Sequence, residues 1–126
     1  MARPLEMLII DDDKEFVESL YADAQRSQIL LTHKSNLEDG QLFLKSSKAR
    51  KLSGVILDVV CMTSKDDEVA KSSFITEALD FFAREASHLP VVILTGEPDQ
   101  YKNLSELFKR KKVYSKGRDE EEMLLF

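Results

Sequence analysis

Short apolar runs alternate along the chain with segments whose apolar residues have helical spacing, and this alternation limits the fold more than any other feature. Strands that alternate with helices are joined by right-handed crossovers into a parallel sheet with helices on both faces. We therefore predict an α/β fold, with a five-stranded parallel sheet in a three-layer sandwich. The runs with the length and β-branching of buried strands are Met7–Ile10, Ile29–Leu31, Val55–Leu57 and Val91–Leu94, with Val113–Ser115 as a weaker fifth.

Five helices are expected, one after each strand. The first begins near Asp13, which we expect to act as its N-cap. Ser35 and Glu38 have the spacing of a capping box and open the second, Pro98 suits the first turn of the fourth, and the acidic run Asp119–Glu122 begins the fifth. The residues expected on buried helix faces are Phe16, Val17, Leu20, Tyr21 and Ala24, then Leu37 and Leu44, then Phe74, Ile75, Ala78, Leu79, Phe82 and Ala86, and finally Tyr101, Leu104 and Phe108.

The composition is that of one folded domain. A chain of 126 residues with 43% hydrophobic and 33% charged residues is ordinary for a globular protein. The net charge of −5 provides no basic face, so we expect no direct nucleic-acid binding by this domain. The apolar segment Leu5–Ile10 is too short for a membrane span, and the single cysteine, Cys61, fits a reducing compartment. We expect a cytoplasmic protein without membrane contact.

Polar residues follow four of the expected strands. The first strand ends at Asp11–Asp13, the third leads into Asp58, the fourth into Thr95–Gly96, and the fifth to Lys116. Ligands of open parallel sheets bind beyond the carboxyl ends of the strands, so these groups should meet at one edge. Two carboxylates 4 Å apart repel by roughly 4 kcal/mol at an effective dielectric constant near 20. We therefore expect a hard divalent cation among them.

The cation that best suits such a cluster is Mg²⁺, which prefers oxygen ligands and keeps several waters. We expect Asp12 and Asp58 to bind it directly and Asp11 to act through water. Lys116 would supply a positive charge for a phosphoryl oxygen, and Thr95 a hydroxyl donor. Together these groups could stabilise an aspartyl phosphate.

The chain resembles the CheY-like receiver domains of two-component response regulators over essentially its whole length. LIIDDD is similar to the acidic pair after the family's first strand, and VILD to its phosphoacceptor strand. VVILTG is similar to the switch strand and YSKG to the segment that carries the family's lysine. The resemblance implies a flavodoxin-like (βα)5 fold with Asp58 as the phosphoacceptor.

The resemblance also implies a regulatory domain for signal transduction rather than an enzyme. Asp58 would accept a phosphoryl group from a sensor histidine kinase or a phosphotransfer protein with Mg²⁺ bound, and self-catalysed hydrolysis would follow. The backbone carbonyl of Val60 would be a further metal ligand, and phosphorylation could promote a homodimer. Because the apolar end Met123–Phe126 has no stop signal, residues 1–126 are expected to be the N-terminal fragment of a longer protein.

The sequence departs from the family at three places. Val59–Met62 replaces the usual Met-Pro pair, and the polar connection Cys61–Ser73 is longer than most, which indicates an insertion and a changed metal loop. Gly117 follows the lysine where a proline is usual. Val113, with Tyr114 beside it, holds the family's aromatic switch position. We expect switching by backbone displacement near Thr95 rather than by an aromatic swing.

Two other functions stay open at this point. The run Asp11–Asp13 is similar to the Asp-x-Asp motif of haloacid-dehalogenase-type phosphatases, but Lys14 and Glu15 replace the glycine and threonine of that motif, and no later strand carries a second acidic pair. A pseudo-receiver, which keeps the fold as a protein-interaction module without phosphorylation, is the second alternative.

Overall fold

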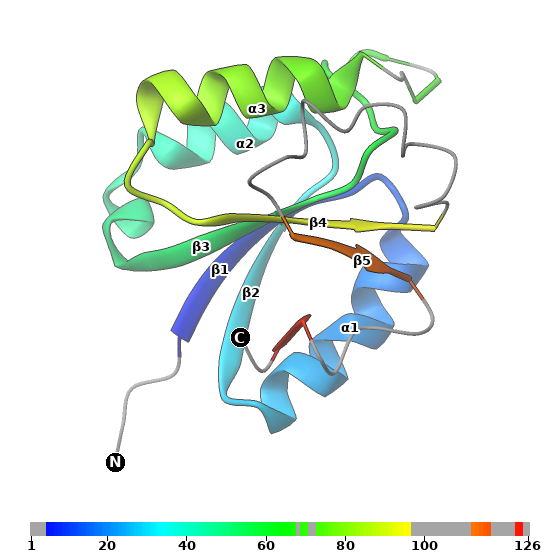
Figure 1. The fold of residues 1–126 in the computed structure, drawn as a ribbon, viewed down its shortest axis with the longest axis vertical. Helices are drawn as coiled ribbons and strands as arrows, with labels where there is room; N and C mark the ends of the chain where they lie inside the picture. The colour runs from blue at the N-terminus through cyan, green and yellow to red at the C-terminus, as the bar shows by residue number, and fades with distance from the viewer. Residues whose placement is uncertain (1–4, 68, 71–72, 97–111, 117–122, 125–126) are drawn as a thin grey trace.

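The structure is a computed structural model that describes residues 5–67, 69–70, 73–96, 112–116 and 123–124, with the backbone alone for 112–115. A single parallel sheet runs through the middle of the molecule with the strand order β2-β1-β3-β4-β5 (Figure 1). All five predicted strands are confirmed, and each is slightly longer than the apolar run that predicted it. The strands are β1 (Leu5–Ile10), β2 (Ile29–Lys34), β3 (Leu52–Leu57), β4 (Val91–Thr95) and β5 (Lys112–Ser115).

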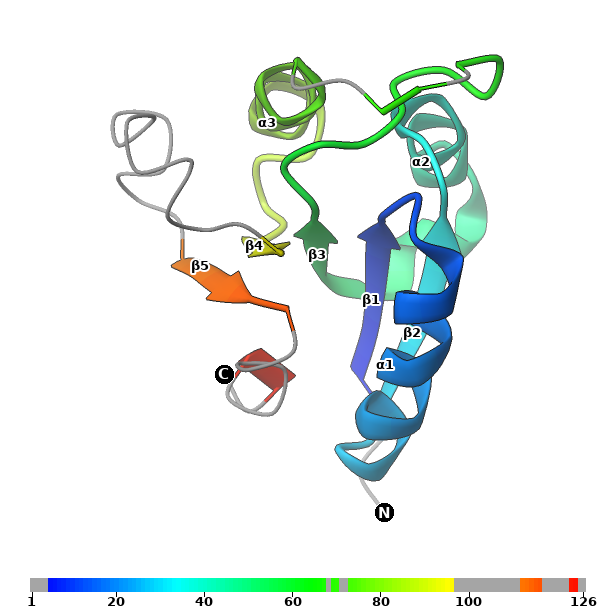
Figure 2. The same cartoon turned by 90° about the vertical axis from the view of Figure 1, so that its right-hand side faces the viewer.

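Helices cover both faces of the sheet, so the predicted three-layer α/β sandwich is confirmed. The helix α1 (Lys14–Arg26) lies below the sheet in Figure 1, and α2 (Leu37–Leu44) and α3 (Phe74–Glu85) lie above it. A short 3-10 helix, η1 (Ser47–Lys51), leads from α2 into β3. In Figure 2, β1 and β3 lie side by side and their arrowheads point in the same direction, as their parallel pairing requires.

The core has two parts, one on each face of the sheet, because successive side chains of a strand point to opposite faces. Leu8 and Ile10 of β1 pack with α2 and α3, while Met7 and Ile9 pack with α1. The central strands are buried on both faces, which explains their continuous apolar sequences. Residues buried on the α2 and α3 side include Val55, Leu57, Phe74, Ile75, Ala78 and Phe82, and those on the α1 side include Val17, Leu20, Ala24, Ile56, Val92, Leu94, Met123 and Leu124.

The first helix begins as predicted, with one error on its buried face. Asp13 is the N-cap, and its Oδ1 accepts a hydrogen bond from the Phe16 backbone N–H at 3.1 Å. Tyr21 is exposed, with 38% of its surface accessible, so its assignment to the buried stripe is wrong. The buried stripe of α1 runs through Val17, Leu20 and Ala24, and a position next to Leu20 lies on the flank of that stripe.

The predicted cap of the second helix is wrong by one residue. Asn36 is the N-cap, and its Oδ1 accepts from the Asp39 N–H at 2.8 Å while its Nδ2 donates to Asp39 Oδ2 at 3.0 Å. The Glu38 side chain binds a different segment, because its Oε1 accepts hydrogen bonds from Ser64 Oγ and from the Lys65 N–H. Ser35 and Glu38 therefore do not form the predicted capping box.

Two predicted helices fall mainly outside the described residues. These are the fourth, from Pro98 with Tyr101, Leu104 and Phe108, and the start of the fifth at Asp119–Glu122. Met123 and Leu124 are helical and buried on the α1 side of the sheet. Within the described part of the chain, no helix combines the length and apolar character needed to cross a membrane.

Candidate functional site

Asp11, Asp12 and Asp58 meet where β1 and β3 end side by side. The two strands pair in parallel up to Ile10 and Leu57, and the Asp58 N–H continues the pairing by donating to the Ile10 carbonyl at 3.3 Å. One carboxylate oxygen from each aspartate lies within 4.8 Å of those of the other two. Asp11 is 1% exposed and Asp58 8% exposed. Strand pairing thus brings together carboxylates that are far apart in the sequence.

Lys116 reaches the same cluster from the far edge of the sheet. Its backbone N–H donates to the Thr95 carbonyl at 2.9 Å, directly after β5. Its Nζ lies 2.8 Å from Asp11 Oδ2 and 3.0 Å from Asp58 Oδ2. The side chain is only 15% exposed, so these two ion pairs are shielded from solvent. The ammonium group therefore links the acidic residues of β1 and β3.

The other predicted site residues lie on the same edge. Thr95 is the last residue of β4, between β3 and β5 in the sheet, and is 3% exposed. Val60 is half-buried two residues after Asp58, and the metal-binding role of its carbonyl stays a prediction. The side chains of Val113 and Tyr114, and Gly117 as a whole, lie outside what the structure describes.

The electrostatics of the cluster favour a proton or a cation. Burial, together with the charge of Asp11, raises the pKa of Asp58 to about 6, although Lys116 opposes the shift. Burial also raises the pKa of Asp12. For Lys116, burial lowers the pKa, but the carboxylates of Asp11 and Asp58 outweigh burial and raise it, so the side chain stays an ammonium. One ammonium faces three carboxylates, which leaves negative charge to be compensated.

Hydrogen bonds from neighbouring groups orient the acidic residues. Asp11 Oδ1 accepts from the Asp13 N–H at 2.9 Å, and Asp58 Oδ1 accepts from the Val59 N–H at 2.7 Å. The Asp11 carbonyl lies 2.6 Å from His33 Nε2, which must donate because a carbonyl can only accept. His33 was not singled out from the sequence, since nothing in its neighbours indicates that β2 places it beside Asp11.

The donor set fits a hard divalent cation. Mg²⁺ in proteins is typically held by one or two carboxylates, with waters and phosphoryl oxygens completing its coordination. Asp11, Asp12 and Asp58 offer oxygen ligands only. Among the residues that the structure describes, no other group of three histidine, cysteine, aspartate or glutamate side chains lies close enough to hold a metal ion. The chemistry of the cluster therefore agrees with the Mg²⁺ expected from the sequence.

The first part of the polar connection after Asp58 lies against the start of α2. The Leu37 N–H donates to the Met62 carbonyl at 3.0 Å, and the Glu38 N–H donates to the Thr63 carbonyl at 2.9 Å. With the two bonds that Glu38 Oε1 accepts, these contacts fasten the connection to the first turn of α2. Cys61 within it is fully buried, and burial raises the pKa of its thiol well above the ordinary value. The first part of the connection after Asp58 is thus held against α2 by hydrogen bonds.

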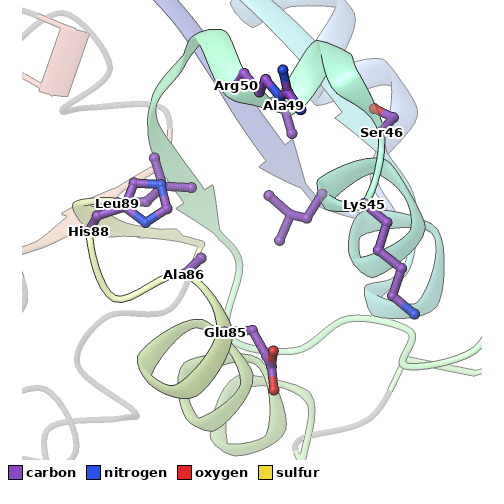
Figure 3. A pocket seen from close by; sticks show the side chains of 9 residues that line it. Lys45, Ser46, Ala49, Arg50, Glu85, Ala86, His88 and Leu89 are labelled. Atoms are coloured by element: carbon purple, nitrogen blue, oxygen red, sulfur yellow. The ribbon is translucent and has the colours of Figure 1, made fainter.

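A cavity of about 250 Å³ lies at the opposite edge of the sheet, between η1 and the carboxyl ends of α2 and α3 (Figure 3). Leu44, Ala86 and Leu89 contribute apolar surface to it, and Lys45 and Glu85 are among its charged lining residues. Ligand sites of open parallel sheets lie at the carboxyl ends of the strands. This cavity adjoins the amino ends of β3 and β4 and takes no part in the acidic cluster.

Comparison with known proteins identifies the fold. No protein-family model matches the sequence, and a search of curated proteins found no match. Among solved structures, the signal receiver domain of an HD domain-containing protein from Pseudomonas fluorescens Pf-5 matches with a TM-score of 0.69 and 18% identity, over 99% of this chain and 85% of that one. A putative response regulator from Chloroflexus aurantiacus matches with a TM-score of 0.71 and 17% identity, over 97% and 93% of the two chains.

A third match links the fold to a ligand. The response regulator TrrA from Thermotoga maritima, in complex with Mg²⁺–BeF, matches with a TM-score of 0.69 and 18% identity, over 94% of this chain and 92% of that one. These likenesses agree with the strand order and the helix placement described above. The chain has the fold of the CheY-like receiver domains of response regulators.

Proposed function

We propose that this chain is a receiver domain that accepts a phosphoryl group on Asp58 and changes conformation in signal transduction. The observation that carries the proposal is the grouping of the Asp11, Asp12 and Asp58 carboxylates within 4.8 Å, with Lys116 Nζ bound to two of them. Solved structures of the same fold include a complex with Mg²⁺–BeF and a BeF3-activated receiver domain from Klebsiella pneumoniae. That two proteins with this fold take up these ligands supports the proposal that the acidic cluster of this chain binds Mg²⁺ and a phosphoryl group.

In the proposed reaction, the Asp58 carboxylate attacks the phosphorus of a phosphohistidine on a partner protein. An O–P bond forms, the N–P bond breaks, and the electron pair of that bond stays with the imidazole. Lys116 moves its charge from the Asp58 carboxylate to a phosphoryl oxygen, and Thr95 donates its hydroxyl to another. Asp11, Asp12, Asp58 and the Val60 carbonyl would hold Mg²⁺, which neutralises charge during transfer.

The cellular setting follows from this role and is part of the proposal. The partner is a sensor histidine kinase or a phosphotransfer protein in the cytoplasm, and the phosphorylated domain can form a homodimer. The chain is a regulatory switch rather than an enzyme with a separate substrate, because it turns over only its own acyl phosphate. Water attacks the Asp58 phosphoryl group in the step that resets the switch.

The test is incubation with acetyl phosphate and Mg²⁺, followed by measurement of the intact mass. The wild-type protein should gain one phosphoryl group, and omission of Mg²⁺ should prevent the gain. Asp58→Asn should abolish it, whereas the matched control Asp80→Asn, at a surface position of α3, should not. An unmodified wild-type protein that also fails to bind Mg²⁺ would contradict the proposal and favour the pseudo-receiver.

A further inference from the structure

The ring of Phe16 lies beside the Lys116 ammonium. Lys116 Nζ is 4.6 Å from the centroid of this ring, well within the range of about 6 Å for cation–π attraction. An ammonium has three N–H donors, and two oxygens lie within hydrogen-bonding distance, Asp11 Oδ2 at 2.8 Å and Asp58 Oδ2 at 3.0 Å. The ammonium is therefore bounded by two carboxylates and one aromatic face.

A short chain of hydrogen bonds connects the Phe16 backbone to the acidic residues. The Asp13 N–H donates to Asp11 Oδ1 at 2.9 Å, and the Phe16 N–H donates to Asp13 Oδ1 at 3.1 Å. Phe16 is half-buried and packs against the core on the α1 side of the sheet. Asp11 and the first turn of α1 thus form one firmly held unit, whereas Lys116 arrives from β5. In the contact between Phe16 and Lys116, the ring therefore belongs to the unit that includes Asp11.

An aromatic face suits this position because it attracts the cation without using a hydrogen-bond acceptor. A lysine side chain has many rotamers, and its ordering carries an entropy cost. The ring reduces the number of rotamers open to Lys116. Because the ring forms no hydrogen bond with the ammonium, each N–H can leave one oxygen partner and bind another. An aliphatic side chain of similar size would fill the same space, but it has no ring quadrupole to attract the charge.

We infer that Phe16 is a positioning residue that holds the Lys116 ammonium between Asp11 and Asp58. This inference rests on the proposed function only for its phosphorylation readout, since the placement of the ammonium can be measured in the unmodified protein. Phe16 touches neither Mg²⁺ nor the phosphoryl group in this scheme. It acts through Lys116.

The direct test is NMR of lysine side chains labelled with ¹³C, in the wild-type protein and two variants. A ring beneath the ammonium should shift the Lys116 ε-methylene signals upfield through its ring current. Phe16→Leu should remove this shift, and Phe16→Tyr should restore it. The matched control is Phe81→Leu, a half-buried aromatic of α3 on the other face of the sheet, which should leave the Lys116 signals in place.

The second readout is the rate of phosphorylation by acetyl phosphate with Mg²⁺, measured in variants that circular dichroism shows to be folded. Phe16→Leu should lower the rate about two- to fivefold, and Phe16→Tyr should restore it. The inference is overturned if the wild-type Lys116 signals have no ring-current shift, or if Phe16→Leu is phosphorylated at the wild-type rate. If the wild-type protein shows the shift but is never phosphorylated, the placement by Phe16 stands and the proposed function fails.

Discussion

Replacement of Asp58 by asparagine should make the protein more stable at neutral pH when no metal is present. The pKa of Asp58 is raised from 3.8 to about 6, mainly by burial and then by the charge of Asp11. A carboxyl group with a raised pKa holds its proton more tightly in the folded protein, so its stabilising contribution is complete below pH 3.8 and is lost as pH rises through about 6. The difference between the two pKa values corresponds to about 3 kcal/mol.

The measurement is urea denaturation in EDTA at pH 5 and pH 8, followed by circular dichroism. Part of the loss has already occurred at pH 5, so the wild-type free energy of unfolding should fall by about 1 to 2 kcal/mol relative to Asp58→Asn between the two values. Other titrating groups are common to both proteins and largely cancel. Asp80→Asn, whose side chain is 64% exposed in the wild type, is the control and should show a difference that is constant with pH.

Two results would contradict a destabilising charge on Asp58: a stability difference between wild type and Asp58→Asn that does not change with pH, or a wild type that gains stability relative to the variant as pH rises. Either result would mean that Lys116 compensates the buried charge fully. If the expected pH dependence is found, addition of Mg²⁺ at pH 8 should raise the free energy of unfolding, because a ligand that binds only the folded state stabilises it. The wild type should gain more than the variant, which has lost a proposed metal ligand.

Three further outcomes are expected. Asp12→Ala should weaken Mg²⁺ binding about tenfold or more in isothermal titration calorimetry, and an unchanged affinity would remove Asp12 from the ligand set. Thr95→Ala should fold normally but be phosphorylated more slowly or fail in its conformational response, so a folded variant identical to the parent in both would contradict its role. Glu38→Gln should weaken the contacts with Ser64 and Lys65 and increase hydrogen exchange in the connection after Asp58. The control Glu18→Gln, at an exposed position of α1, should leave this exchange unchanged. Equal protection in both variants would contradict the role of Glu38 in holding the connection against α2.

The sheet, and the edge of the sheet at which the site lies, could be predicted from the sequence because both follow from the same pattern of strands. Buried parallel strands appear as short apolar runs, and the residues that follow them must meet at the carboxyl edge. Asp11, Asp58, Thr95 and Lys116 each follow such a run, so their common location needed no knowledge of side-chain directions. The structure brings all four to this edge.

The contacts made by side chains across elements could not be predicted in the same way. Ser35 with Glu38 and Asn36 with Asp39 have the same spacing, and the choice between them depends on Glu38 binding the connection after Asp58. Phe16 appeared in the sequence only as one more apolar position of a helix. Its contact with Lys116 depends on how the first turn of α1 is oriented relative to the end of β5.

The same limit applies to His33. The predicted second strand ends at Leu31, two residues before His33, whereas β2 extends to Lys34. A single histidine near the end of a strand also does not indicate that its ring reaches the Asp11 carbonyl. Hydrogen bonds of this kind are decided by strand register and rotamer, neither of which leaves a pattern in the sequence.

The proposed function requires that Asp58, and no other residue, carries the phosphoryl group. The most direct measurement is to treat the protein with acetyl phosphate and Mg²⁺, reduce the acyl phosphate with borohydride to trap the modified position as an alcohol, and identify it by mass spectrometry of peptides. One modified residue is expected, at Asp58. A modification mapped to Asp11, Asp12 or any surface carboxylate, with Asp58 unchanged, would contradict it.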